Sequence, residues 1–128
     1  MKTKFDLPNI SDNDKAAILN AFSDYCKFYN KRWWPKDPKT RNVGEAIALM
    51  HSELSEGLEG YRKDLMDEHL PQFKSLSVEL ADCLIRIFDF AETFAPDLGE
   101  AFVAKMAYNQ IREDHKLENR MKEGGKKF

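Results

Sequence analysis

The chain has 128 residues, of which 42% are hydrophobic and 33% are charged, and its formal net charge is -2. This length and apolar content are typical of one packed domain, so we expect residues 1–128 to form a single domain. The near balance of charge excludes the strong positive field that binding to nucleic acid or to an acidic membrane surface would need.

No apolar stretch is long enough for a signal peptide or a membrane span, so we expect a cytoplasmic protein that binds neither membranes nor nucleic acid. Cys26 and Cys83 lack CxxC spacing and stand among apolar residues, which favours reduced core thiols over a disulfide. A structural zinc needs four nitrogen or sulfur ligands at suitable spacings, which the sequence does not favour.

The first predicted helix begins near Ser11, whose side chain can cap the first turn, with Asp14 three residues further on. It ends before Trp33, and residues 35–41 (PKDPKTR), with two prolines and several basic side chains, predict a loop. Asn42 and Glu45 then form a plausible capping pair for a second helix.

After Arg62 a polar segment predicts a connection to a third helix, which runs from about Ser75 to Thr93. Pro96 follows, and Asp97 with Glu100 predicts the cap of a fourth helix. We therefore predict an all-α fold, an antiparallel bundle of about four main helices, with a flexible tail at about residues 120–128.

The third helix is apolar almost all round, except for one polar wedge. The wedge residues are Glu79, Asp82, Arg86 and Asp89. A helix this apolar is expected to be buried, so its carboxylates need a solvent channel or a compensating positive charge, which a metal ion could supply.

Glu53 and Glu56 lie three residues apart on the second helix. If the second and third helices are adjacent and antiparallel, the ELSE and ELAD motifs can converge. Converging carboxylates repel one another unless hard cations lie between them, and oxygen ligands suit Mg²⁺ or Mn²⁺. A lone motif of this kind is more often a solvated helix face, but two such motifs favour a metal site.

On the fourth helix, Lys105, Asn109 and Arg112 follow one another at helical spacing on the side begun by Leu98. Such a face could contact the phosphates of a nucleotide, or it could simply emerge into solvent.

Together these motifs resemble the MazG-like family of all-α nucleoside triphosphate pyrophosphohydrolases. The first motif is Glu53-Leu-Ser-Glu56, and the second, after a gap of 22 residues, is Glu79-Leu-Ala-Asp82. The segment KMAYNQIR, with Lys105 of the fourth helix, comes next. The resemblance covers about residues 43–112, the expected metal-site core.

The resemblance implies hydrolysis of a (d)NTP between its α- and β-phosphates, giving a (d)NMP and pyrophosphate. The implied catalytic metal ligands for Mg²⁺, or Mn²⁺, are Glu53, Glu56, Glu79 and Asp82. The implied phosphate contacts are Lys105, Asn109 and Arg112. Many members carry a further glutamate where this chain has Ser52, which leaves open the number of metal ions and the carboxylate that activates water.

Trp33 and Trp34 lie beside the basic loop and are candidates for stacking on the nucleobase, although they can equally close the end of the bundle. A di-iron carboxylate bundle would need two ExxH motifs, which the sequence lacks. A non-catalytic dimerisation or regulatory module of the same fold remains the alternative. In either case we expect a homodimer or larger homo-oligomer, because two helices carry more apolar surface than a monomer of this size can bury.

Overall fold

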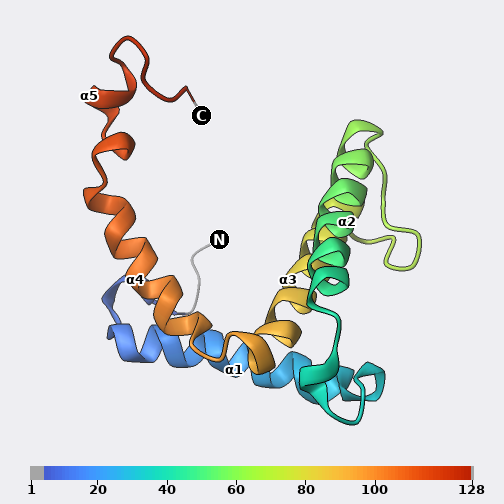
Figure 1. Ribbon diagram of the computed structural model, residues 1–128. Coiled ribbons are helices and arrows are strands. Elements are labelled where there is room, and N and C mark those ends of the chain that lie inside the picture. Colours follow the sequence, from blue (N-terminus) through green and yellow to red (C-terminus); the bar gives the residue numbers. More distant parts are fainter. Residues whose placement is uncertain (1–4, 128) are drawn as a thin grey trace. The chain divides into compact units, whose positions relative to one another are not determined.

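The computed structural model describes residues 5–127, which form helices and connecting turns (Figure 1). The α-helices are α1 (Asp12–Asn30), α2 (Val43–Arg62), α3 (Ser75–Phe94), α4 (Leu98–Ile111) and the short α5 (Leu117–Arg120). Single 3₁₀ turns are η1 (Leu7–Asn9), η2 (Lys31–Trp33), η3 (Pro38–Thr40) and η4 (Glu113–His115). Among the described residues no strand forms, and one isolated β-bridge joins Met66 to Lys74. The all-α prediction is confirmed.

The chain divides into two compact units. The first unit comprises the described residues of Met1–Leu19 and Asp97–Phe128, and the second unit is Asn20–Pro96. The helix α1 contributes its first turns to the first unit and its remaining turns to the second.

Two of the predicted helix caps are confirmed. The backbone N–H of Asp14 donates to Ser11 Oγ at 3.1 Å, and that of Glu45 donates to Asn42 Oδ1 at 3.0 Å. The third predicted cap is wrong in its detail, because Asp97 stands at the N-cap of α4 without a side-chain hydrogen bond to the helix. Its backbone, with φ -95° and ψ 18°, lies outside the extended region from which a cap side chain normally reaches the first turn.

The antiparallel pair of α2 and α3 forms the centre of the second unit (Figure 1). Two glycines of α2 lie against α3, and a Cβ built on Gly57 would lie at an ordinary contact distance of 3.4 Å from Glu79 Cβ. A Cβ built on Gly60 would lie 2.7 Å from Ser75 Cβ and closer still to Ser75 Oγ, distances that side chains do not tolerate. The close packing of α2 against the start of α3 therefore depends on glycine at position 60.

A tight connection follows α2. Asp64 has φ 52°, the left-handed conformation that commonly ends a helix, and the N–H of Leu65 donates to the carbonyl of Gly60 at 2.9 Å. The N–H of Ser75 donates to the carbonyl of Leu65 at 3.0 Å. These bonds fix the start of α3 beside the end of α2.

The later turns of α1 contact α3 through both apolar and charged groups. Phe22 stacks on Phe88 with ring centroids 5.5 Å apart, and Lys27 Nζ lies 2.7 Å from Glu92 Oε2. Cys26 and Cys83 are buried and free, as the sequence predicts.

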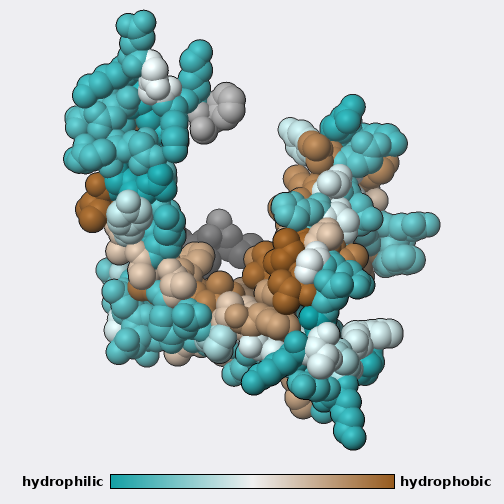
Figure 2. Space-filling model, in the orientation of Figure 1, coloured by the Kyte–Doolittle hydropathy of each residue, from teal (hydrophilic) through white to brown (hydrophobic). Residues whose placement is uncertain are grey.

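Small side chains make up most of the buried apolar core. Its members among the described residues are Ala16, Cys26, Ala46, Cys83 and Ala91. Many large apolar side chains stay exposed, and the visible face of the α2–α3 pair carries a broad hydrophobic region (Figure 2). In the described part of the chain, no helix combines the length and the apolar character that crossing a membrane requires.

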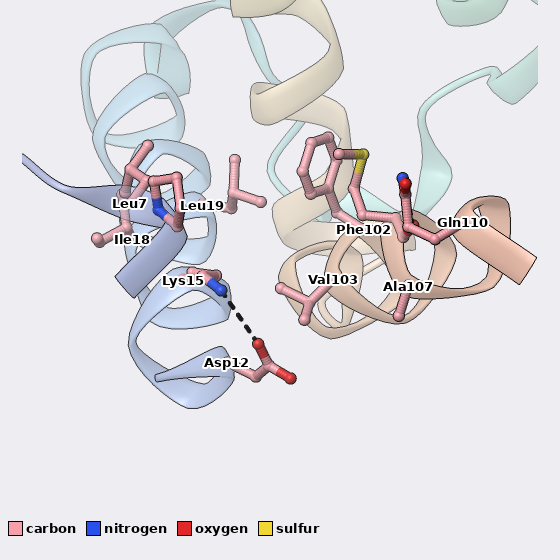
Figure 3. Close-up of a pocket in the computed structure, with 11 residues that line it drawn as sticks. Leu7, Asp12, Lys15, Ile18, Leu19, Phe102, Val103, Ala107 and Gln110 are labelled. Atoms are coloured by element: carbon pink, nitrogen blue, oxygen red, sulfur yellow. Dashed lines mark hydrogen bonds and ion pairs between the residues drawn. The ribbon is translucent and has the colours of Figure 1, made fainter. Parts of the chain in front are cut away.

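The first unit contains an apolar pocket of about 570 Å³ between η1, α1 and α4 (Figure 3). Phe102 and Val103 line it from α4, and Leu7 and Ile18 line it from the N-terminal side. Its charged members belong to one ion pair, in which Lys15 Nζ lies 3.3 Å from Asp12 Oδ1. An apolar lining of this kind does not suit a metal ion or a phosphate.

We expect Gly60→Ala to lower the free energy of unfolding by about 1–3 kcal/mol, because the new methyl group would force α2 and α3 apart at Ser75. Gly57→Ala is the matched control: its methyl group would make ordinary contacts at 3.4 Å, and alanine favours a helix over glycine by about 0.5–1 kcal/mol. Urea denaturation of both variants measures the difference. Equal effects of the two substitutions would contradict the close approach at Gly60.

Candidate metal centre

Three glutamates of the predicted site converge between α2 and α3. One carboxylate oxygen from each of Glu53, Glu56 and Glu79 lies within 4.8 Å of the other two. Glu53 is buried, Glu79 is half-buried and Glu56 is exposed, so the group extends from the interior to the surface. Gly57 of α2 lies opposite Glu79 of α3, and a Cβ built on the glycine would lie 3.4 Å from Glu79 Cβ.

The crowding of the three carboxylates affects the protonation of Glu79. Burial raises its pKa from 4.5 to about 7, together with a hydrogen bond to Glu53 and the negative charge of Glu56. The charge of Asp82 contributes in the same direction. At neutral pH the group therefore retains a proton for part of the time, as expected where carboxylates meet without enough positive charge.

Asp82, the fourth predicted ligand, is exposed and is not one of the three residues whose oxygens lie within 4.8 Å. Burial of its carboxylate raises the pKa of Asp82, and so does the charge of Glu53, while Arg86 opposes them. Asp67, in the connection between α2 and α3, also raises the pKa of Asp82. Asp82 thus belongs to the electrostatic surroundings of the group, and Asp67 is a neighbour that helical spacing could not have revealed.

Arg86 is the charged partner of the buried glutamate. Its Nε lies 2.6 Å from Glu53 Oε1, and the Glu53 side chain is only 8% exposed. The sequence places Arg86 in the polar wedge of α3 but assigns it no partner. The signal that could have found the contact is the position of Arg86 one turn after Asp82, on the side of α3 that faces α2.

The two tryptophans have different surroundings. Trp34 donates from its indole N–H to Asp89 Oδ1 at 2.8 Å, and the cations of Lys27 and Arg41 lie 4.1 Å and 4.4 Å from the centre of its ring. Asp89 is buried, and Arg41 Nη1 also contacts it at 3.5 Å. Trp34 therefore attaches the basic loop to α3. Trp33 is 74% exposed.

The three residues predicted to contact phosphate lie in the first unit. Lys105 Nζ lies 5.0 Å from the ring centre of Tyr108, and Arg112 is ion-paired with Asp114. The Oδ1 atom of Asn109 is buried and has no hydrogen-bond partner among the described residues. The carboxylates lie in the second unit.

In comparisons with known protein families, with curated proteins and with solved structures, the chain matches none of them.

Chemically, the glutamate group is a set of hard oxygen donors with a deficit of positive charge. Such a set suits a hard divalent cation, which prefers carboxylate oxygens and offsets more charge than a proton does. The group contains no histidine or cysteine, so the softer metals have no favoured ligand there.

The pKa of Glu79 predicts a pH dependence of stability. Because its folded-state pKa of about 7 exceeds the ordinary value of 4.5, the folded state binds the proton more tightly, and stability falls as the pH rises between these values. In metal-free buffer we expect Glu79→Gln to be more stable than the wild type at pH 8, by on the order of 1 kcal/mol after allowance for solvent screening. This advantage should vanish near pH 4.5.

Urea denaturation in EDTA at the two pH values measures the effect. Glu68→Gln, in the exposed connection between α2 and α3, is the control for the loss of one acidic group. A Glu79→Gln variant that is less stable than the wild type at pH 8 would contradict the crowding of the carboxylates.

Proposed function

We propose that the protein is a Mg²⁺-dependent nucleoside triphosphate pyrophosphohydrolase of the MazG-like type, which converts a (d)NTP to a (d)NMP and pyrophosphate. The observation that carries the proposal is the convergence of Glu53, Glu56 and Glu79 from two helices, with their oxygens within 4.8 Å. These are three of the four residues that the family resemblance assigns to the metal.

The residues present fit a divalent ion. Glu53, Glu56 and Glu79 would hold it, and Asp82 is the further ligand that the resemblance assigns. Glu79 retains a proton because the group has too little positive charge, and a cation would supply that charge. When bound, Mg²⁺ would neutralise phosphate oxygens and lower the pKa of a water molecule, as metal ions do in phosphoryl hydrolysis.

The different exposure of the glutamates suits them to different roles. Glu53 is buried and paired with Arg86, so its proposed role is to bind the metal ion from a fixed position. Glu56 is exposed, so it is better placed to accept the proton of the water that attacks phosphorus. Trp34 is engaged by Asp89, which makes Trp33 the better candidate for stacking on the nucleobase.

Three further assignments rest on the sequence alone. Phosphate contact by Lys105, Asn109 and Arg112 stays a prediction from the resemblance. A cytoplasmic location and the absence of nucleic-acid binding stay predictions from composition and charge.

We expect pyrophosphate release from one or more members of a panel of canonical and modified (d)NTPs when Mg²⁺ is present. Glu79→Gln should lower kcat/KM by at least about 100-fold, because loss of one metal ligand costs several kcal/mol of transition-state stabilisation. A coupled pyrophosphate assay measures both, with circular dichroism to show that the fold persists.

Glu68→Gln controls for the loss of an acidic side chain and should retain wild-type activity. Absence of release from every nucleotide, or release that Glu79→Gln leaves unchanged, would overturn the proposal. The non-catalytic helical module would then be the better account of the carboxylate group.

We also propose that the chain forms a homodimer or larger homo-oligomer. On α2, Leu54 and Leu58 each come one residue after a position that faces α3. On α3, Leu80 and Leu84 each come one residue after a position that faces α2. In an antiparallel pair these four side chains fall on one face, and each is about half exposed, between 44% and 58%. A continuous leucine face of this kind is typical of a surface that a second copy covers.

We expect Leu84→Glu to lower the molar mass measured by light scattering to that of the monomer at micromolar concentration. The substitution places a charge at a site that is already 51% exposed within one chain, so it should disturb association more than folding. Gln72→Glu, in the connection between α2 and α3, is the control for an added charge. A wild-type protein that is monomeric at every concentration would contradict the proposal.

A further inference from the structure

Arg86 brings a permanent positive charge into the carboxylate group. Its Nε contacts Glu53 Oε1 at 2.6 Å, and its side chain is 36% exposed while that of Glu53 is 8% exposed. A carboxylate so deeply buried requires a compensating charge, and the guanidinium supplies it without any metal ion.

The position of Arg86 on α3 also brings its positive charge near Asp82. Asp82 and Arg86 are four residues apart on one helix, so their side chains lie on the same face one turn apart. Arg86 therefore lies within electrostatic reach of Asp82 of α3 while it contacts Glu53 of α2. Asp82 is not among the three glutamates whose oxygens lie within 4.8 Å of one another, so Arg86 and the glutamate group share Glu53.

The balance of formal charge favours a single additional ion. The four acidic side chains carry four negative charges when ionised, and Arg86 offsets one of them. One divalent ion then leaves a single negative charge, whereas two would make the site positive before any nucleotide is bound. Without the arginine, two divalent ions would balance the four carboxylates.

We propose that Arg86 is the built-in cation of the site, so that the nucleotide-free protein binds one divalent ion where the four carboxylates alone would bind two. The inference rests on the proposed metal site and concerns its stoichiometry. Arg86 is a positioning residue in this account, because it acts through Glu53.

Binding of Mn²⁺ to the whole chain tests the inference without any assay of activity. Isothermal titration calorimetry, with electron paramagnetic resonance of the free ion, should give one Mn²⁺ per chain for the wild type. Arg86→Gln should bind two, and Arg86→Lys, which keeps the charge, should bind one. Arg62→Gln is the matched control and should bind one, because Arg62 is 71% exposed and lies 4.0 Å from Glu59.

Two Mn²⁺ ions per wild-type chain would overturn the inference, and this measurement needs no variant to fold. It would also be overturned by a folded Arg86→Gln protein that binds a single ion. A wild type that binds no Mn²⁺ would remove the metal site itself, together with the inference. Binding of one ion without hydrolysis of any nucleotide would sink the proposed function and leave the role of Arg86 standing.

Discussion

The close approach of α2 and α3 is the constraint on which the candidate site depends. Gly60 allows the two backbones to come together at the start of α3, and Glu79 of α3 meets the glutamates of α2. Charge repulsion alone would drive these carboxylates apart. The packing of the helices holds them together at a cost in free energy, which Glu79 reduces by retaining a proton. Three oxygens placed so closely could also hold a metal ion.

Much of the fold follows from local sequence. Apolar periodicity located the four longer helices, and the Ser11 and Asn42 caps formed as expected because each needs only residues within one turn. Asp97 failed as a side-chain cap because its backbone conformation is set by the turn that follows α3, which no local motif describes. The short helix α5 and the 3₁₀ turns lacked a sufficiently long periodic pattern to be predicted.

The convergence of three glutamates was predictable from the sequence, but the placement of Asp82 and the partner of Arg86 were not. Helical spacing and the antiparallel connection indicated that Glu53, Glu56 and Glu79 would converge, and they do. The separation of Asp82 from that group, and the contact of Arg86 with Glu53, depend on the rotation of one helix against the other. A difference of a few ångströms in that packing decides which charges meet, and a helical wheel contains no such information.

The partners of the polar residues on α3 distinguish those that hold the fold together from those free to bind a ligand. Towards the end of the helix, Asp89 accepts a hydrogen bond from the indole N–H of Trp34, and Glu92 forms an ion pair with Lys27. Both carboxylates are thus engaged by segments that precede α2 in the chain. Near the start of the helix, Glu79 has other carboxylates for neighbours, and Arg86 marks the boundary between the two regions. The polar residues of α3 therefore fall into two regions. Asp89 and Glu92 attach the basic loop and α1 to α3, whereas Glu79 belongs to the carboxylate group.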